Sequence, residues 1–493
     1  MKRIYTIRNG RFFLVFCFLL LISNVAKNAH ASPSIFNPAI AYPVAHWSES
    51  VAIGDVNGDG RNDIVLVTSI AYPNVEDERD YIYIFLQDIF GLLSPIRVKS
   101  TSELASRLET VTIGDFNSDG VDDIAVGYFS DLIELYSVTG NNDVVQLASF
   151  SSEYSYVIKS ADVDGDGRDD LVGIGWGGDD VAVYLNDLYT GISPAYMNTY
   201  YAPHGGYDDL ALGDISQDGL IDIVVMSGQS FLDNLAVLTQ QGEGVFNAPE
   251  FFDLGGRILT NGVTITDANS DGLNDIVASY GGNRPSSNIA VYYQDAYDGF
   301  SSPLSLPSYD IPEPIESADL NLDGKEDLAV LHGGWVALGV YLQQQNGTLA
   351  EERRYTIPYA SHYAPQGLAL GDINNDGKPD AVIADYNHGL VVLTNAVVPP
   401  NVEAGDDIRV KRSHSKSISL NGSAWDSDGT VVKVSWKQVS GVAVELLGED
   451  TLTPVFKAPL VKGEKEIVLK FELSAEDNIG AVSTDRVSVA IHK

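Results

Sequence analysis

A short acidic segment occurs seven times in this chain, with the pattern D-x-[DN]-x-D-G-x-x-D in six copies and one substitution in the remaining copy. The first copy, DVNGDGRND, carries side-chain oxygens at positions one, three, five and nine and a glycine at position six. Calcium prefers carboxylate, amide and carbonyl oxygens, of which it takes about six to eight. Glycine permits a bend that a Cβ atom would resist. The segments therefore predict seven calcium loops, with the carbonyl of position seven as a further ligand.

The predicted ligands are positions one, three, five, seven and nine of each copy, position seven through its backbone oxygen. They are Asp55, Asn57, Asp59, Arg61 and Asp63; Asp115, Asn117, Asp119, Val121 and Asp123; Asp162, Asp164, Asp166, Arg168 and Asp170; Asp214, Ser216, Asp218, Leu220 and Asp222; Asp267, Asn269, Asp271, Leu273 and Asp275; Asp319, Asn321, Asp323, Lys325 and Asp327; and Asp372, Asn374, Asp376, Lys378 and Asp380. We expect the fourth loop to be the weakest, because Ser216 replaces a carboxylate or amide. Acidic turns without any metal are the alternative.

The spacing excludes a helical EF-hand. An EF-hand loop ends in a bidentate glutamate at position twelve and is flanked by helices. Here position twelve is apolar, small or glycine, as in Leu66 and Gly173, and it falls inside a run such as DIVLVTS. Runs of four to seven β-branched and aromatic residues bounded by turn residues are typical of strands.

The loops recur every 47 to 60 residues, each with short apolar runs before and after it. About four strands per unit, repeated seven times, predict a seven-bladed β-propeller. The last unit ends after its third strand. Residues 35–44, IFNPAIAYPV, are similar to the fourth segment of an inner unit, VFNAPEFFDL. We therefore expect the N-terminal segment to supply the outer strand of the last blade.

These loops and their period resemble the FG-GAP/VCBS repeats of bacterial surface proteins and of integrin α-subunit propellers. The "FG" half is retained loosely, as in Ile53-Gly54 and Leu370-Gly371, and the "GAP" half is absent. The resemblance covers residues 34–396 and implies calcium in the loops and a partner on the opposite face.

After Pro399-Pro400 the pattern changes to longer alternating runs, which are typical of sandwich strands. Residues 401–493 resemble PKD-type Ig-like domains, with Trp436 as the core tryptophan. The expected fold is thus all-β, a seven-bladed propeller followed by an Ig-like β-sandwich. Asp426, Asp428 and Asp477 form either one more calcium site or ordinary turns.

Residues 1–31 have the features of a secretory signal peptide: a basic start, an apolar stretch at 12–22 and Ala-His-Ala before Ser32. An uncleaved anchor is the alternative. Cleavage would remove Cys17, the sole cysteine, and five basic residues, and it would change the net charge of −38 to −43. We expect a secreted, periplasmic or cell-surface protein without a later transmembrane segment. Its charge repels nucleic acid.

Aromatic, histidine and arginine residues gather at the propeller loops expected opposite the calcium loops. Such side chains bind sugars or peptides by stacking and directed hydrogen bonds, although they also pack between blades. The candidate ligand-binding residues are Trp47, Trp176, His204, Tyr207, Arg284, Trp335, His362, Tyr363 and His388.

Two functions fit the sequence. The first is a non-enzymatic adhesion module that binds an extracellular glycan or a cell-surface protein, with structural calcium. The second is an extracellular polysaccharide lyase or hydrolase on the same face. A lyase needs a base and a cation opposite the substrate carboxylate, and His204, Tyr207, His362 and Arg284 could serve. No motif ties these residues together, so no catalytic residue is assigned, and we favour binding.

Overall fold

The computed structural model describes residues 34–45, 47–69, 81–88, 91–92, 95–99, 107–129, 132–178, 180–201, 207–227, 234–254, 260–295, 299–333, 335–359, 366–411, 417–426, 430–459, 466–478 and 480–492. The predicted signal peptide, residues 1–31, lies outside these ranges. All regular elements of the described residues are β-strands. No helix in these ranges has the length and apolar character that a membrane crossing needs.

Seven antiparallel sheets of four strands each account for residues 40–393, and we number them in chain order. The strands, in order within each sheet, are β2 (Trp47–Gly54), β3 (Asp63–Ser69), β4 (Tyr81–Phe85) and β7 (Ile96–Lys99) in sheet one; β8 (Leu108–Gly114), β9 (Asp123–Tyr128), β10 (Leu132–Val138) and β11 (Val144–Phe150) in sheet two; β12 (Val157–Ala161), β13 (Asp170–Ile174), β14 (Asp180–Asp187) and β15 (Gly191–Tyr201) in sheet three; β16 (Tyr207–Gly213), β17 (Asp222–Ser227), β18 (Leu235–Leu238) and β21 (Glu250–Phe252) in sheet four; β22 (Thr260–Thr266), β23 (Asp275–Tyr280), β24 (Asn288–Tyr292) and β27 (Leu304–Pro307) in sheet five; β28 (Pro312–Ala318), β29 (Asp327–His332), β30 (Ala337–Tyr341) and β31 (Arg353–Thr356) in sheet six; and β32 (Leu368–Gly371), β33 (Asp380–Asp385), β34 (Gly389–Leu393) and β1 (Ile40–Tyr42) in sheet seven. Small hairpins follow three of the third strands: β5 (Gln87–Asp88) with β6 (Gly91–Leu92), β19 (Gln240–Gly242) with β20 (Val245–Phe246), and β25 (Gln294–Asp295) with β26 (Gly299–Phe300).

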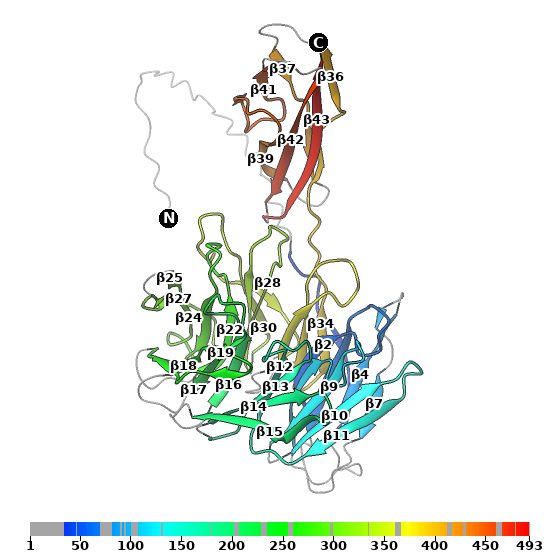
Figure 1. Cartoon of the computed structure of the whole chain (residues 1–493), viewed down its shortest axis with the longest axis vertical. Helices are drawn as coiled ribbons and strands as arrows, with labels where there is room; N and C mark the ends of the chain where they lie inside the picture. Colours follow the sequence, from blue (N-terminus) through cyan, green and yellow to red (C-terminus); the bar gives the residue numbers. More distant parts are fainter. Residues whose placement is uncertain are drawn as a thin grey trace, which may run out of the picture.

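The sheets follow one another around a common centre, as Figure 1 shows. The first strand of each sheet contacts the first strand of the next, and β32 of sheet seven contacts β2 of sheet one. Because each sheet is covered on both faces by its neighbours, its middle strands are buried almost completely, and all seven residues of β3 are buried. The apolar clusters accordingly join residues of adjacent sheets, as where Val65 packs with Val126.

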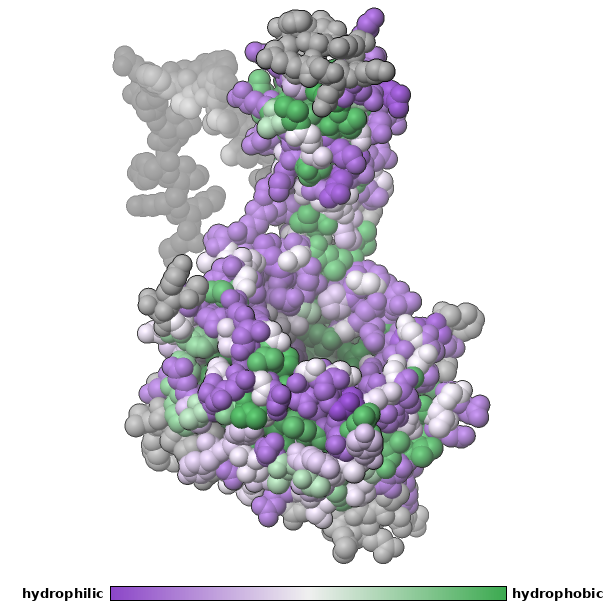
Figure 2. Space-filling model, in the orientation of Figure 1, coloured by the Kyte–Doolittle hydropathy of each residue, from purple (hydrophilic) through white to green (hydrophobic). Residues whose placement is uncertain are grey.

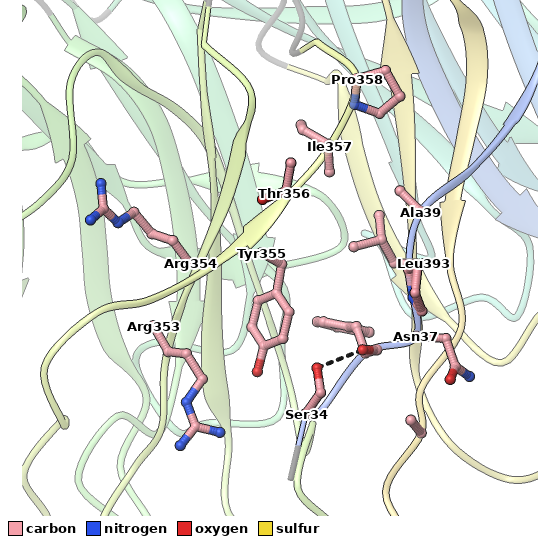
Figure 3. A pocket seen from close by; sticks show the side chains of 13 residues that line it. Ser34, Asn37, Ala39, Arg353, Arg354, Tyr355, Thr356, Ile357, Pro358 and Leu393 are labelled. Carbon is pink, nitrogen blue, oxygen red and sulfur yellow. Dashed lines mark hydrogen bonds between the residues drawn. The ribbon is translucent and has the colours of Figure 1, made fainter. Parts of the chain in front are cut away.

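The N-terminal segment completes sheet seven, as the sequence predicts. Strand β1 pairs antiparallel with β34, and Phe36 forms an isolated bridge with Asn395. A groove of about 1050 Å³ runs between this segment and β31 of sheet six (Figure 3). The Tyr355 ring meets the Phe36 ring edge-on at 5.2 Å, whereas the Arg354 side chain points away from the N-terminal segment. The groove therefore lies where residues 34–39 pack beside sheet six.

Polar side chains connect sheets across the ring. The Gln366 amide beside sheet seven donates a 2.8 Å hydrogen bond to the Ile158 carbonyl in sheet three. Lys159 Nζ lies 3.7 Å from a Glu316 carboxylate oxygen in sheet six. These polar contacts therefore join sheets that are not adjacent in the ring.

The C-terminal domain, residues 401–492, is a β-sandwich that stands on one side of the ring (Figures 1 and 2). Its strands are β35 (Asn401–Glu403), β36 (Ile408–Lys411), β37 (Ser417–Ser419), β38 (Ser423–Trp425), β39 (Val431–Ser440), β40 (Leu446–Leu447), β41 (Val455–Lys457), β42 (Glu466–Asp477) and β43 (Val482–His492). One sheet has the order β36-β43-β42-β39 and a second the order β37-β41-β40. Trp436 is buried between them with Phe456 and Phe471, as expected of the core tryptophan.

Candidate metal loops and the opposite face

Each of the seven acidic loops joins the first and second strands of its sheet, and its ninth residue begins the second strand. The loops turn sharply at two positions. The glycine at position six has a positive φ, for example 82° at Gly60. Position four is also left-handed in every loop, including the non-glycine residues Ser118, Gln217, Ser270, Leu322 and Asn375. Such residues carry about 1–3 kcal/mol of strain each unless the surroundings compensate. The sequence pattern did not reveal this requirement at position four.

The third loop brings three carboxylates together. One oxygen each of Asp162, Asp164 and Asp166 lies within 4.8 Å of the others. Calcium binds oxygens at 2.3–2.6 Å, so two oxygens on one ion lie at most about 5 Å apart. These three side chains therefore fit a single calcium ion.

The loop's own backbone holds the first carboxylate in place. In all seven loops the amides of positions five and six donate to the two oxygens of the position-one aspartate, at 2.7–3.1 Å. In six loops the amide of position five also donates to the side-chain oxygen of position three, as Asp59 does to Asn57 at 2.9 Å. No such bond to Ser216 is described in the fourth loop. These hydrogen bonds orient the position-one carboxylate in every loop, and the fourth loop, which carries Ser216, remains the one predicted to be weakest.

The ninth aspartate of each loop also holds the backbone of its own sheet. Its side chain is fully buried in all seven loops. In six of them its Oδ1 accepts a 2.6–2.8 Å hydrogen bond from a backbone amide near the end of the third strand of the same sheet or just after it. Burial raises the pKa of Asp63 to about 7 and of Asp327 to about 8, with the aspartates at positions one and five adding repulsion. Oδ2 of Asp63 is buried without a hydrogen-bond partner, which a cation beside it would remedy.

The residue whose amide makes this bond carries a side-chain amide of its own. We call these residues the latch amides: Gln87, Asn186, Gln240, Gln294, Gln343 and Asn395. The side-chain nitrogen of each donates to a backbone carbonyl in the acidic loop of the preceding sheet, for example 2.8 Å from Gln240 Nε2 to the Val163 carbonyl. Each latch amide therefore ties the ninth aspartate of its own sheet to the neighbouring loop.

Position eight makes a second connection between loops. Asp122 of loop two accepts a 2.9 Å hydrogen bond from the Asp55 amide of loop one, and Asp169 of loop three accepts one of 2.8 Å from Asp115. Asn62 and Asn274 instead donate to position-one carbonyls of the preceding loops. The acidic loops are therefore linked in sequence around much of the ring.

We expect Gln240→Ala to lower the free energy of unfolding by about 1–3 kcal/mol, because it leaves two carbonyls, of Val163 and Ile221, without their donor. Urea denaturation measures the change. Gln241→Ala is the matched control, since its side chain is exposed and donates to Asn247 within its own hairpin, and it should change stability little. Equal effects of the two substitutions on stability would contradict the stabilising role of this latch amide.

The candidate ligand residues on the opposite face fall into three separate clusters. In the first, Trp47 stacks on Tyr386 with ring centroids 4.6 Å apart. Nearby in sequence, His388 Nδ1 lies 3.0 Å from Asp385 Oδ1, at the end of β33. This cluster joins sheets one and seven. Trp47 packs between the two sheets and is also a candidate ligand-binding residue.

The second cluster joins sheets two and three. Trp176 is 63 % exposed and its ring lies 5.4 Å from that of Phe129, which also contacts Tyr156. The Arg107 guanidinium lies 5.8 Å from the Phe129 ring on the same side. An aromatic surface this exposed is available for stacking.

The third cluster joins sheets five and six around Tyr309. The guanidinium carbons of Arg284 and Arg354 lie 4.4 and 4.2 Å from the Tyr309 ring centroid. Trp335, 39 % exposed, meets the same ring at 6.1 Å. The cluster thus combines two cations with two aromatic rings.

The remaining candidates, His204, His362, Tyr363 and the Tyr207 side chain, lie outside the described residues. No ligand role for Phe129, Tyr309 or Arg354 was expected from the sequence. Tyr309 and Arg354 stand in ordinary strand-linking and strand segments, and no sequence signal distinguishes them. Their pairing with Trp335 arises only from the meeting of two sheets.

In the C-terminal domain Asp477 behaves as a turn residue. Its Oδ1 accepts a 3.0 Å hydrogen bond from the Ala481 amide, which closes the hairpin between β42 and β43. Asp428 lies outside the described residues. The described geometry of Asp477 is that of the ordinary turn considered as an alternative above.

Comparisons with known proteins match both parts of the chain. A model of the FG-GAP-like repeat matches residues 55–126 and 319–383, and a PKD-domain family model matches residues 404–491. Integrin alpha-6 of Homo sapiens is 29% identical over 128 residues, which is 25% of this chain and 11% of the integrin. The chain therefore matches only a small part of that relative.

A solved PKD domain, from the KIAA 1837 protein, aligns with 20% of this chain and 91% of its own length, at 19% identity and a TM-score of 0.16. The two family matches fall on the ring of sheets and on the sandwich respectively. The chain carries FG-GAP-like repeats followed by a C-terminal PKD domain.

Proposed function

We propose that this protein is an exported binding module whose propeller is held together by calcium in its seven acidic loops. The observation that carries the proposal is the group of oxygens from Asp162, Asp164 and Asp166 within 4.8 Å of one another. The same sequence pattern and backbone hydrogen bonds recur in the other loops, with Ser216 as the exception at position three. Calcium suits these loops better than transition metals, because every predicted ligand is an oxygen.

The calcium would have a structural role. Each loop is joined by hydrogen bonds to a neighbouring sheet through a latch amide, a position-eight side chain or both. An ion that fixes the loop therefore also fixes the contact between two sheets. This supplies rigidity to a chain that has no cysteine outside its first 31 residues.

The binding surface would lie on the opposite face, at the second and third clusters. Trp176 and Trp335 present exposed indoles in clusters that also contain arginines, a combination that stacks on sugars or on the side chains of a protein. Integrin alpha-6 matches 25% of this chain, and FG-GAP-like repeats with a PKD domain fit an extracellular adhesion protein. The partner is thus an extracellular glycan or a cell-surface protein.

We expect Trp176→Ala to weaken binding to that partner about tenfold or more, since exposed aromatic anchors often contribute about 2 kcal/mol. A glycan array and a panel of cell-surface proteins, both with calcium present, would identify the partner, and titration would give the Kd. Trp425→Ala in the C-terminal domain removes another well-exposed tryptophan, 55 % accessible, and should leave the Kd unchanged. If the two substitutions act alike, the binding face lies elsewhere.

The same preparation tests the enzymatic alternative. Incubation with acidic and neutral polysaccharides should produce no new absorbance from unsaturated uronate and no new reducing ends. Appearance of either product would replace the binding proposal with a lyase or a hydrolase. Calcium content is measured separately, by equilibrium dialysis of the purified mature chain, so that the two halves of the proposal are decided independently.

A further inference from the structure

The sixth acidic loop differs from the other six because the C-terminal domain covers it. Asn321, at position three, is only 2 % exposed, whereas the residue at this position is half-buried or exposed in every other loop. Asp323, at position five, is half-buried, whereas all its counterparts are exposed. The covering element is the hairpin between β42 and β43, which points at the ring in Figure 1.

The contact is close and depends on a glycine. A Cβ atom on Gly480 would lie 2.6 Å from Asn321 Nδ2 and 3.9 Å from Asp323 Oδ2. The next residue, Ala481, is fully buried and belongs to the same apolar cluster as Leu320 and Leu338 of the propeller. The Val482 amide then donates a 3.3 Å hydrogen bond to the Leu322 carbonyl inside the loop. The hairpin thus touches positions three, four and five of the sixth loop.

A polar contact flanks this apolar one. Lys433 Nζ of β39 donates a 2.6 Å hydrogen bond to Gln345 Oε1 of sheet six, and it lies 3.5 Å from a Glu476 carboxylate oxygen. Gln345 Nε2 in turn donates to Glu476. A cavity of about 320 Å³ between the two parts is lined by these residues and by Asp323 and Lys325. The interface therefore has a buried apolar point and a polar rim, and it includes a predicted calcium ligand, Asp323.

We propose that calcium in the sixth loop and docking of the C-terminal domain are thermodynamically coupled, so that the filled loop holds this domain against the propeller. The inference depends on the calcium binding proposed above. Docking constrains Asn321, Leu322 and Asp323. The same three residues must be ordered for the ion to bind. By linkage, an ion that orders these residues strengthens docking, and docking strengthens the ion's binding by the same factor.

The other loops supply matched controls, because the contacts described for the C-terminal domain fall on the sixth loop and the sheet that carries it. Asp319 is the position-one ligand of loop six, and its carboxylate is held by amides of its own loop. Asp319→Asn should therefore weaken calcium binding to loop six without removing a contact with the C-terminal domain. Asp115→Asn makes the same change in loop two, where Asn117 and Asp119 are exposed.

The distance between the propeller and the C-terminal domain is measured by Förster resonance energy transfer between two dyes in the full mature chain. The predicted mature sequence has no cysteine, so Val245→Cys and Leu447→Cys, both exposed, provide one dye site in each part. In saturating calcium, Asp319→Asn should shift transfer efficiency to the value of the calcium-free protein. Asp115→Asn should retain the wild-type value. Each variant should bind one ion fewer in equilibrium dialysis.

The outcomes separate the two proposals. If both variants lose one ion and neither changes transfer, calcium binding stands and the coupling is wrong. If neither the wild type nor the variants bind calcium, the calcium proposal fails and the coupling fails with it. The converse variant, Lys433→Ala, should lower the affinity of one site about 5- to 150-fold, the usual range of such coupling. Lys437 is exposed on the same strand, and Lys437→Ala should leave the calcium affinity of every site unchanged. Equal calcium titrations for these two variants would also overturn the coupling.

Discussion

Chelation of calcium with EDTA should lower the melting temperature of the mature protein by about 10 °C or more. A ligand at 100 times its Kd stabilises a fold by about 2.7 kcal/mol per site, so even two of seven sites contribute about 5 kcal/mol. Each kcal/mol corresponds to about 2–4 °C for a domain of moderate size. Because the latch amides join the loops to neighbouring sheets, loss of calcium should destabilise the whole ring.

Calorimetry with calcium, with EDTA and with calcium restored would measure this effect. A single substitution localises it: Asp162→Asn in the third loop should remove one ion and lower the melting temperature by several degrees. Asp143→Asn makes the same change of charge on an exposed turn between β10 and β11 and should do neither. An unchanged midpoint in EDTA would refute a structural role for the metal.

The calcium-free protein should become less stable as the pH rises from about 5 to about 8. The cause is the buried ninth aspartate of the loops. Burial raises the pKa of Asp63 and Asp275 from 3.8 to about 7, and that of Asp170 and Asp380 to about 6. At a pH between the pKa of such an aspartate in the unfolded chain and its higher pKa in the folded chain, the folded chain holds a proton that the unfolded chain has released. Unfolding then releases protons, and the free energy of unfolding falls as pH increases.

Calcium should reverse the sign of this dependence. The bound ion requires ionised ligands, so the affinity for calcium, and with it the calcium-dependent part of the stability, should increase over the same pH range. Urea midpoints at pH 5, 6, 7 and 8, with EDTA or with saturating calcium, would give the two slopes. Asp63→Asn removes one titrating group and should flatten the EDTA slope. A calcium-free protein that gains stability up to pH 8 would show that these carboxylates are ionised without metal.

The architecture could be predicted because its signals are local and repeated. A strict nine-residue pattern marks where strands one and two of each unit meet, and runs such as DIVLVTS are apolar throughout because both faces of each sheet are covered. The assignment of residues 35–44 to the last sheet succeeded for the same reason, since that segment is similar to the outer segments of other units.

The contacts between units could not be predicted in this way. The latch amides are Gln in some sheets and Asn in others, and the structure describes none for sheet two, so they form no pattern that a single sequence reveals. The opposite face illustrates the same limit. Tyr309 becomes the centre of a cluster only because Arg284 and Arg354 approach it from different sheets. The covering of loop six by Gly480 depends on how two domains meet, which no local signal encodes.

The pairing of β1 with β34 has a consequence for how the protein is made. Asn37 and Thr394 are hydrogen-bonded neighbours although 357 positions separate them along the chain. A ribosome makes the chain from its N-terminus, so the first partner is available early and the second only near the end of the propeller's synthesis. The last sheet therefore stays incomplete until almost all of the propeller has been synthesised, so closure of the ring is a late step in folding.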